Sequence, residues 1–239
     1  MHDKIKRYWH ELACVMQAMP FDILTSAAEM LLDCYRRGST VFILGNGGSA
    51  ATASHFACDL AKGTQATGLP AFRVVSLSDN VPLLTAWAND TSYERIFAEQ
   101  LATLVRPADV LVAISASGNS SNVLAAARAA RQSGAITIAL TGQPGGKLSR
   151  LANLAIRVPA QSIEQVEDAH LVIAHSLCVV LREQLPMQAA LLEVESSVSS
   201  RPRKPAHSSY RFRDDYMRSG HKSSGRLEKG FEPDTTFYR

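Results

Sequence analysis

The sequence has few cysteines and no long apolar run. No stretch reaches about 18 uninterrupted apolar residues, which excludes an ordinary membrane-spanning helix. The N-terminus carries charges and has no apolar segment of the signal-peptide type, so we expect a cytoplasmic protein. The four cysteines, Cys14, Cys34, Cys58 and Cys178, lie within apolar patterns, and no two form a Cys-x-x-Cys pair. They are predicted to be buried reduced thiols rather than disulfides or a cysteine-based metal site.

A strongly basic surface is also lacking in most of the chain. The net charge is +3, but residues 201–239 hold ten Lys and Arg against five Asp and Glu. The remaining residues, 1–200, carry 15 basic and 17 acidic side chains and a net charge of −2. This near-neutral body gives no indication of a nucleic-acid-binding surface.

Two nucleotide-binding signatures are incomplete. The glycine-rich turn GNGGSA at residues 45–50 lacks the Gly-Lys-Ser/Thr ending of a P-loop. A dinucleotide fingerprint can be aligned on Gly45 and Gly47, and it would have Ala50 at its third position, where alanine is sometimes allowed. The acid that should bind the ribose is missing, because the next apolar run ends in serines and the nearest acid, Asp79, comes too late. A dinucleotide site is therefore not expected.

The sequence does contain five short apolar runs separated by helical patterns. The runs cover residues 41–44, 72–77, 110–115, 136–140 and 154–158. Helices are predicted at about 49–61, 80–88, 119–133 and 146–152, with a long one at 163–186. This alternation predicts an α/β protein with a doubly wound, five-stranded parallel sheet and right-handed crossovers. Ligands of such folds bind beyond the carboxyl ends of the strands.

Two amphipathic helices are predicted ahead of the sheet, at residues 3–18 and 21–36. Together they would form a helical hairpin over residues 1–37, with a broad apolar face for contact between subunits. The apolar period stops after about Leu192, and residues 197–239 are rich in Ser, Arg, Lys, Pro, Asp and Gly. We expect a folded domain over 1–196 and a basic, disordered tail over 197–239, whose partner is unknown.

Two strand-to-helix turns have the same chemistry. GNGGSA (45–50) follows the first apolar run and SASGNSSN (115–122) follows the third. Glycine permits a tight turn and close approach of a ligand, and the amide groups of a helix N-terminus favour an anion. Ordinary turns of doubly wound proteins use the same residues to cap helices, so one such turn alone is also compatible with a structural role. The serine hydroxyls of the second turn favour a small sugar phosphate.

Two histidines and two carboxylates lie on the predicted helices at helical spacing. His55 and Asp59 are four residues apart on one face, and Glu167 and His175 are eight apart, about two turns. Most helix histidines are satisfied or solvated side chains without a catalytic role. If both helices border the same crevice, the four groups form a candidate divalent-metal or acid–base set.

Five of these segments together resemble the SIS-domain phosphoheptose isomerases and their relative, the DnaA initiator-associating protein. The segments are GNGGSAATASHFACDL (45–60), WANDTSYE (87–94), ISASGNSSNV (114–123), TGQPGGKL (141–148) and VEDAHLVIAH (166–175). The likeness spans about residues 1–190. It implies the SIS fold and the isomerisation of sedoheptulose 7-phosphate to D-glycero-D-manno-heptose 7-phosphate, which supplies the heptose of bacterial lipopolysaccharide. It also implies a homotetramer with active sites at subunit interfaces and one zinc ion per subunit.

The resemblance also assigns roles to particular residues. The sugar-binding turn falls on Asn46, Gly47 and Gly48, and further substrate contacts on Asn89, Asp90 and Glu167. The phosphate-binding loop falls on Ser115, Ala116, Ser117 and Ser120. The zinc ligands fall on His55, Asp59, Glu167 and His175, and the catalytic pair is Asp59 and His175.

Three of these positions depart from the family pattern. Family isomerases typically carry Glu at position 59, Gln at position 167 and Thr at position 116, where this chain has Asp59, Glu167 and Ala116. Asp59 matters most, since the family's Glu acts as the base and a misplacement of about 1 Å can cost roughly 10²-fold in rate. The non-catalytic relative lacks the histidine found here at His175.

We therefore predict a phosphosugar isomerase that binds a phosphosugar substrate. Two alternatives remain open at this point. One is an isomerase of a different phosphosugar, with the three departures reshaping the pocket. The other is a non-enzymatic regulator that binds a protein partner such as the replication initiator DnaA.

Overall fold

The computed structural model describes the backbone of residues 1–199 and the side chains of residues 1–187. The tail predicted from residue 197 lies, from residue 200 onward, outside this described part. Among the described residues, no helix combines the length and the apolar content that a membrane crossing requires.

Five parallel strands form one sheet in the order β2-β1-β3-β4-β5. They are β1 (Thr40–Leu44), β2 (Arg73–Ser76), β3 (Val110–Ile114), β4 (Ile136–Gly142) and β5 (Leu154–Val158). The central strand β3 is buried along its whole length, and β1 and β4 are buried except at their first residues, as continuous apolar runs predict for a sheet covered on both faces. The predicted doubly wound parallel sheet is confirmed.

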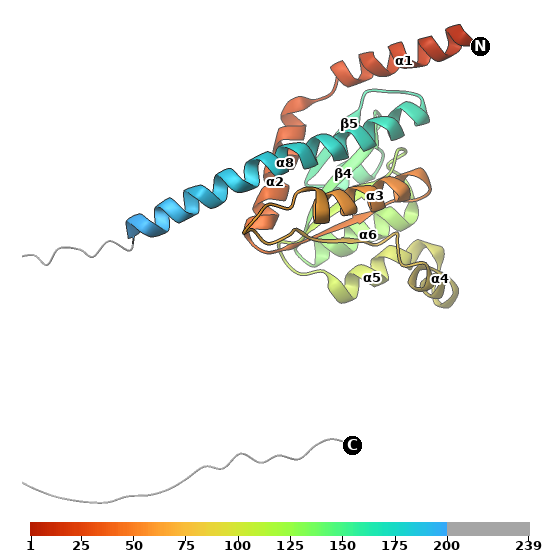
Figure 1. Cartoon of the computed structure of the whole chain (residues 1–239). Coiled ribbons are helices and arrows are strands. Elements are labelled where there is room, and N and C mark those ends of the chain that lie inside the picture. The colour runs from red at the N-terminus through yellow and green to blue at the C-terminus, as the bar shows by residue number, and fades with distance from the viewer. Residues whose placement is uncertain (200–239) are drawn as a thin grey trace, which may run out of the picture. The chain divides into compact units, whose positions relative to one another are not determined.

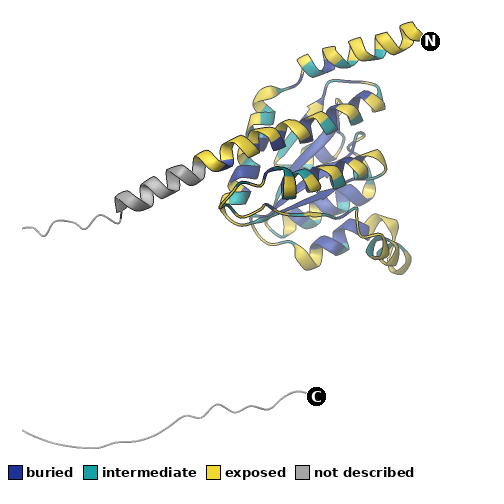
Figure 2. Ribbon diagram, viewed as in Figure 1, coloured by how far each residue is buried: buried dark blue, intermediate teal, exposed yellow. Residues whose placement is uncertain are grey.

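Helices cover both faces of the sheet (Figure 1). Alternate residues of the strands feed two separate apolar cores. One core joins the sheet to α2 (Phe21–Arg36), α3 (Gly48–Cys58) and α8 (Ile163–Ser199). The other joins it to α4 (Val81–Asp90), α5 (Ile96–Leu104), α6 (Ser121–Gln132) and α7 (Leu148–Leu151). Figure 2 shows the buried strands between these helical layers.

The two N-terminal helices are both present. α1 (His2–Gln17) and α2 are joined by a short connection, and both contact α8. α1 is mostly exposed and reaches past the sheet (Figures 1 and 2), with Val15 its only buried residue. Its apolar side chains Ile5 and Trp9 are 55% and 69% exposed, so the apolar face predicted for contact between subunits is open in the single chain.

The structure departs from the sequence-based expectations in the details of three helices. α5 was not expected, although Phe97 and Leu101 lie one turn apart on its buried side. α3 ends at Cys58 and continues as a π-helical turn, Asp59–Gly63, where one helix was predicted. α8 runs through Pro186 to Ser199, beyond its predicted end.

The cysteine prediction is half wrong. All four thiols are free, and Cys34 and Cys178 are buried, but Cys14 and Cys58 are exposed. Cys14 and Cys58 lie on the solvent-facing sides of α1 and α3. The side chains of these helices are small or of mixed polarity, so the sequence does not indicate which helix face packs against the rest of the protein. Burial raises the pKa of the Cys34 thiol to about 11, so that thiol stays protonated.

Candidate functional site

The two polar turns lie side by side at the carboxyl edge of the sheet. β1 pairs directly with β3, so the turns that follow them, residues 45–48 and 115–120, are neighbours. The chain leaves β1 for α3 on one face and leaves β3 for α6 on the other. This is the point where the strand order reverses, and open α/β sheets bind their ligands there.

An amide pair connects the two turns. Asn46 Nδ2 donates to Asn122 Oδ1 at 2.8 Å, and Asn122 Nδ2 donates back to Asn46 Oδ1 at 2.9 Å. The hydroxyl of Tyr93 donates to the same Asn46 oxygen at 3.0 Å. Both lone pairs of that oxygen are therefore used, and Asn46 has one amide proton left for a ligand. The sequence assigned no role to Asn122 or Tyr93, although Asn122 is only 1% exposed.

The second turn is built against the loop that follows β4. Gly118 has a φ of +63°, and a Cβ added there would lie 2.2 Å from the carbonyl oxygen of Gly145. Asn119 Oδ1 accepts the backbone N–H of Lys147 at 3.1 Å, which joins the loops again. This close backbone packing requires glycine and fixes the course of residues 115–120.

The predicted phosphate-binding residues line this turn. The Ser115 and Ser120 hydroxyls lie 3.2 Å apart, and Ser115 is buried while Ser117 is exposed. Ala116 is half-buried, and its carbonyl accepts the N–H of Gly142 at 2.9 Å. Ser120 precedes α6, and its side chain accepts no bond from the first turn of that helix. The site therefore offers hydroxyl groups and a helix N-terminus to an anion.

α3 and α8 run in parallel and place matching residues opposite one another. Near the start, the Glu167 carboxylate lies against Gly48, where an added Cβ would be 2.7 Å from Glu167 Oε2. Further along, His55 Nε2 lies 2.9 Å from His175 Nε2. Beyond the end of α3, Arg182 Nε donates to the carbonyl of Gly63 at 2.6 Å. The tertiary structure thus brings the two predicted helix faces together.

Three of the four predicted metal ligands converge. Asp59 Oδ2 lies 3.4 Å from His55 Nε2 and 3.7 Å from His175 Nε2. All three ligand atoms lie within 4.8 Å of one another, and among the described residues they form the one such group. Glu167 is not part of it. Glu167 lies eight residues before His175 on α8, roughly 12 Å along the axis, and its carboxylate faces the sugar-binding turn.

The donor set suits a divalent metal. Two imidazole nitrogens and one carboxylate oxygen are the three protein ligands of many catalytic zinc sites. Ligand atoms around a tetrahedral zinc are about 3.3 Å apart, given metal–ligand distances near 2.0–2.1 Å. The observed separations of 2.9, 3.4 and 3.7 Å are close to this value. The residues present therefore match a metal site with an open position.

Asn89 and Asp90 lie at the exposed end of α4. Asn89 Nδ2 donates to Asp90 Oδ1 at 2.9 Å, and within the described part of the chain neither side chain forms a hydrogen bond to the two turns. Tyr93, a few residues further, does reach the first turn through its bond to Asn46. The segment that carries the predicted contacts is therefore tied to the site through Tyr93.

Two buried titratable groups lie beneath the site on α8. Burial raises the pKa of the Cys178 thiol to about 12, and the nearby Asp59 carboxylate contributes to the shift. Burial also lowers the pKa of His170 to about 4, although the Thr141 carbonyl beside the ring favours its protonated form. Neither ring nitrogen of His170 nor the Thr141 hydroxyl is in hydrogen-bond geometry with another group. His170 is therefore neutral near pH 7.

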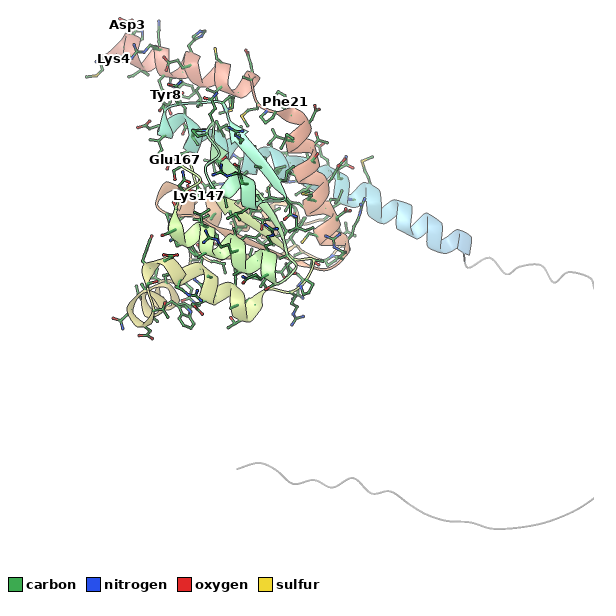
Figure 3. The ribbon with its side chains drawn as sticks, turned by 180° about the vertical axis from the view of Figure 1, so that it is seen from behind. Asp3, Lys4, Tyr8, Phe21, Lys147 and Glu167 are labelled. Carbon is green, nitrogen blue, oxygen red and sulfur yellow. The ribbon has the colours of Figure 1, made fainter. Side chains whose placement is uncertain are left out.

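α1 is fixed to the first turns of α8, close to Glu167 (Figure 3). The Tyr8 hydroxyl donates to Asp168 at 2.5 Å, and Gln165 Nε2 donates to Glu11 at 3.1 Å. The Asp168 carboxylate raises the pKa of Tyr8 to about 12. The N-terminal helix thus borders the site.

Known proteins similar to this chain include several with one description. A profile of the SIS domain matches residues 7–142 of this chain. The phosphoheptose isomerase of Roseiflexus sp. is 38% identical over 165 residues, which cover 68% of this chain and 82% of that protein. The phosphoheptose isomerase of Rhodospirillum rubrum is 40% identical over 162 residues, covering 68% and 86%.

Solved structures agree with these relatives. The phosphoheptose isomerase of Neisseria gonorrhoeae superposes with a TM-score of 0.71 at 30% identity, covering 76% of this chain and 98% of that one. The phosphoheptose isomerase of Francisella tularensis also gives a TM-score of 0.71, at 31% identity, covering 76% and 97%.

Proposed function

Since the chain belongs to the SIS-domain family of phosphoheptose isomerases and is a phosphosugar isomerase, we propose that it converts sedoheptulose 7-phosphate to D-glycero-D-manno-heptose 7-phosphate. The product would supply heptose for bacterial lipopolysaccharide. One observation carries this proposal: His55, about two helical turns along α3 from the first polar turn, converges with Asp59 and with His175 of α8. Such a site suits a substrate with a phosphate at one end and a carbonyl at the other.

The phosphate is proposed to bind at the second turn. Ser115, Ser117 and Ser120 provide hydroxyl groups, and α6 directs its N-terminal amides and the positive end of its dipole to the same place. Ala116 provides only its backbone there. Binding energy gained at this remote end positions the reacting end of the sugar.

The sugar chain is proposed to lie along the first turn, between the phosphate and the triad. Asn46 has one free amide proton, so it would donate to a hydroxyl or carbonyl oxygen of the sugar. Gly47, whose Cβ position has nothing within 4 Å, would allow the ligand to approach the backbone closely, and Gly48 makes room for the Glu167 carboxylate. The Glu167 carboxylate beside Gly48 would accept a bond from a sugar hydroxyl, and Asn89 and Asp90 would complete the contacts.

The chemistry is a proton transfer between neighbouring carbons. Asp59 takes a proton from C1 of the ketose while His175 donates a proton to the carbonyl oxygen on C2, which gives an enediol. His175 then takes the proton of the C1 hydroxyl, and Asp59 returns its proton to C2. The products are a C1 aldehyde and a C2 hydroxyl, so protons and electrons balance.

His55, Asp59 and His175 are the residues proposed to hold a zinc ion. Bound there, zinc would polarise the substrate oxygens as a Lewis acid. Asp59 and His175 would then transfer protons through the carboxylate oxygen and the ring nitrogen that do not coordinate the ion. We place Glu167 with the substrate-binding residues rather than as the fourth ligand, because its carboxylate lies against Gly48. Metal analysis of the purified protein tests this, with the prediction of one zinc per subunit that is lost in His55→Ala.

Direct assay tests the activity. Purified protein is incubated with sedoheptulose 7-phosphate and zinc, and the heptose aldose is followed by chromatography. The control carries both Asp59→Ala and His175→Ala. Turnover no higher than that of the control would reject the proposed reaction.

Asp59 has a shorter side chain than the Glu that is typical of the family, and Ala116 lacks the hydroxyl of the typical Thr. The alternative of a different phosphosugar substrate therefore also needs a test. A panel of ketose and aldose phosphates of five to seven carbons, assayed in the same way, separates the two isomerase alternatives. A non-enzymatic regulator would bind sugar phosphates without turning any over. The convergent triad, with both histidines retained, favours the enzyme.

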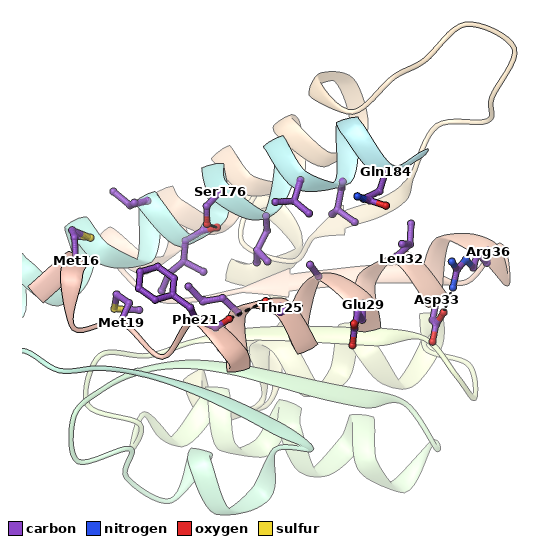
Figure 4. Close-up of a pocket in the computed structure, with 17 residues that line it drawn as sticks. Met16, Met19, Phe21, Thr25, Glu29, Leu32, Asp33, Arg36, Ser176 and Gln184 are labelled. Carbon is purple, nitrogen blue, oxygen red and sulfur yellow. Dashed lines mark hydrogen bonds and ion pairs between the residues drawn. The ribbon is translucent and has the colours of Figure 1, made fainter. Parts of the chain in front are cut away.

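We also propose that the protein is a homotetramer with its sites at subunit interfaces. A groove of about 950 Å³ lies between α2 and α8 and is lined mainly by apolar side chains (Figure 4). Phe21 on one side and Val172 and Val180 on the other are 60%, 48% and 42% exposed. Exposed apolar surface of this extent typically marks a protein–protein contact.

A further inference from the structure

The helix that carries His55 changes its hydrogen-bond pattern at the proposed base. α3 is regular through Cys58, and Asp59 is the first residue of the π-helical turn Asp59–Gly63. A π-helical turn bonds each N–H one residue further back than an α-helix does, so it displaces the backbone and redirects its side chains. Such turns are costly for the chain alone and occur frequently at functional sites.

A cation from α8 binds the last residue of this turn. Arg182 Nε donates to the carbonyl oxygen of Gly63 at 2.6 Å, a short bond from a charged donor. The guanidinium lies beside Gly63, since a Cβ built there would be in ordinary contact with Arg182 Nη2 at 3.7 Å. The same Cβ position lies 3.7 Å from Asp59 Cβ and 3.9 Å from Asp59 Oδ1. Arg182 and Asp59 therefore border the same glycine.

α8 thus contacts the turn at two points. His175 meets Asp59 at the start of the turn, and Arg182, two helical turns further along α8, binds Gly63 at its end. The buried Cys178 lies between these points, near enough to both Asp59 and Arg182 for each charge to act on its thiol. α8 therefore contacts the first and the last residue of the turn.

We propose that Arg182 is a positioning residue for the reaction, which holds the π-helical turn so that the Asp59 carboxylate faces His55 and His175. This inference rests on the proposed function, because Asp59 is the base there. The aspartate is one methylene shorter than the usual glutamate, so its reach depends on where the backbone places it. Arg182 does not touch the substrate and acts only through the turn.

Loss of Arg182 frees the carbonyl of Gly63 and lets the turn revert to ordinary helical bonding. A shift of about 1 Å in the carboxylate is sufficient for a rate loss of roughly 10²-fold. Arg182→Ala is expected to lower kcat about 10- to 100-fold and to leave KM within about threefold, since the phosphate and sugar contacts remain. Arg182→Lys keeps a charged donor and should recover part of kcat.

The matched control is Arg128→Ala, which removes an exposed arginine from α6, away from the turn. Circular dichroism and thermal unfolding establish that all variants are folded. A kcat for Arg182→Ala within threefold of the parent, or a loss that Arg128→Ala shares, would overturn the assignment. So would the absence of any recovery in Arg182→Lys.

A second measurement is independent of turnover. The metal-free protein is titrated with Co²⁺, and the visible absorption bands report the geometry of its ligands. Arg182→Ala should shift these bands or weaken Co²⁺ binding about tenfold, because Asp59 moves, whereas Arg128→Ala should not. If the parent protein isomerises no phosphosugar, the proposed function fails, and the Co²⁺ spectra still decide whether Arg182 positions Asp59. Identical spectra would reject that role.

Discussion

At the scale of single residues, the orientation of Asn46 is set by two partners that are distant in the sequence. Asn122 lies 76 positions away and Tyr93 47 positions away. Asn122 fixes which way the amide faces, because its own oxygen also accepts the N–H of Val123 at 2.9 Å. The direction of the proton that Asn46 offers to a ligand is therefore built into the fold.

Removing the Tyr93 hydroxyl should weaken substrate binding. Tyr93→Phe loses one intramolecular hydrogen bond, so the free energy of unfolding should fall by about 0.5–1.5 kcal/mol. KM should rise by up to about tenfold, because the Asn46 amide is then less firmly oriented toward the ligand. Tyr35→Phe is the control, because it also loses one hydroxyl bond, to the Pro70 carbonyl, away from the site. Steady-state kinetics measure both. Equal KM values for the two variants would contradict the role of Tyr93.

His170 is a buried base without a hydrogen-bonded partner, and this makes stability depend on pH. The pKa of about 4 in the folded protein compares with about 6.5 in the unfolded chain. Between these values the unfolded chain binds a proton that the folded protein does not. The free energy of unfolding therefore decreases as the pH falls from 6.5 toward 4. Above pH 6.5 the stabilisation that comes from the neutral His170 is retained.

This dependence can be measured by urea unfolding at pH 7.5 and pH 5. The His170 contribution to the loss of stability on going to pH 5 is expected to be about 2 kcal/mol. His170→Leu should remove that part of the loss, whereas His2→Gln, at an exposed position, should leave it unchanged. An unaltered pH dependence in His170→Leu would show that the histidine titrates normally.

The types of site residue could be predicted from the sequence, but several of their partners could not. The spacing of His55 and Asp59 indicates one helix face, and that prediction is confirmed by the 3.4 Å separation. The bond from Arg182 to Gly63 joins residues 119 positions apart, and no local pattern encodes it. Glu167 lies on α8 as predicted, yet its carboxylate lies against Gly48 rather than beside His175. Its side chain is too short to reach the part of α3 that lies opposite His175.

At the scale of elements, the site depends on two loops that pack backbone to backbone. The loop after β4 presses Gly145 and Gly146 against Gly118, and Leu148 N–H donates to the Gly118 carbonyl at 2.9 Å. No side chain fits between them, so the phosphate-binding turn has little freedom to move.

A methyl group at Gly118 should separate these loops. Gly118→Ala adds a Cβ 2.2 Å from the Gly145 oxygen, in addition to the strain of a positive φ. Gly68→Ala is the matched control, since its φ is +80° but nothing lies within 4 Å of the new Cβ. The control should lose about 1–2 kcal/mol and Gly118→Ala at least about 2 kcal/mol more, with weaker phosphosugar binding. Chemical unfolding measures the difference, and equal losses would refute the close packing.

The sequence predicted the presence of most helices better than their bounds or their hydrogen-bond pattern. Apolar spacing indicates α2, α3, α6 and the start of α8, because a buried helix face repeats about every 3.6 residues. The π-helical turn Asp59–Gly63 has no such signature, and its contact with Arg182 of α8 joins residues that are distant in the sequence. α8 continues past Pro186, where a helix would ordinarily end or kink, so that residue alone does not set its length.

At the scale of the whole molecule, an open groove lined mainly by apolar side chains lies between α2 and α8. If this groove is a contact between subunits, a charge placed in it should break the assembly. The free-energy cost of burying an unpaired carboxylate is far larger than the stabilisation that a single surface contact gives.

Val180→Glu should therefore convert the tetramer to smaller species and lower activity together with it. Light scattering coupled to size-exclusion chromatography measures the mass, and the isomerase assay measures the activity. Val81→Glu is the control, because Val81 is also an exposed valine, at 62%, but it lies on α4, which does not line the groove. A tetramer that persists in Val180→Glu would show that the groove is not the contact.

The sequence by itself determined the strand–helix alternation, the two polar turns and the residue types available for proton transfer. Each of these follows from neighbouring residues, whose burial and hydrogen bonding repeat with the period of a strand or a helix. Only the tertiary structure decided which groups meet: Asn46 with Asn122, His55 with His175 and Gly63 with Arg182. Those contacts depend on strand order and on the parallel course of α3 and α8, which arise from packing across the whole sheet.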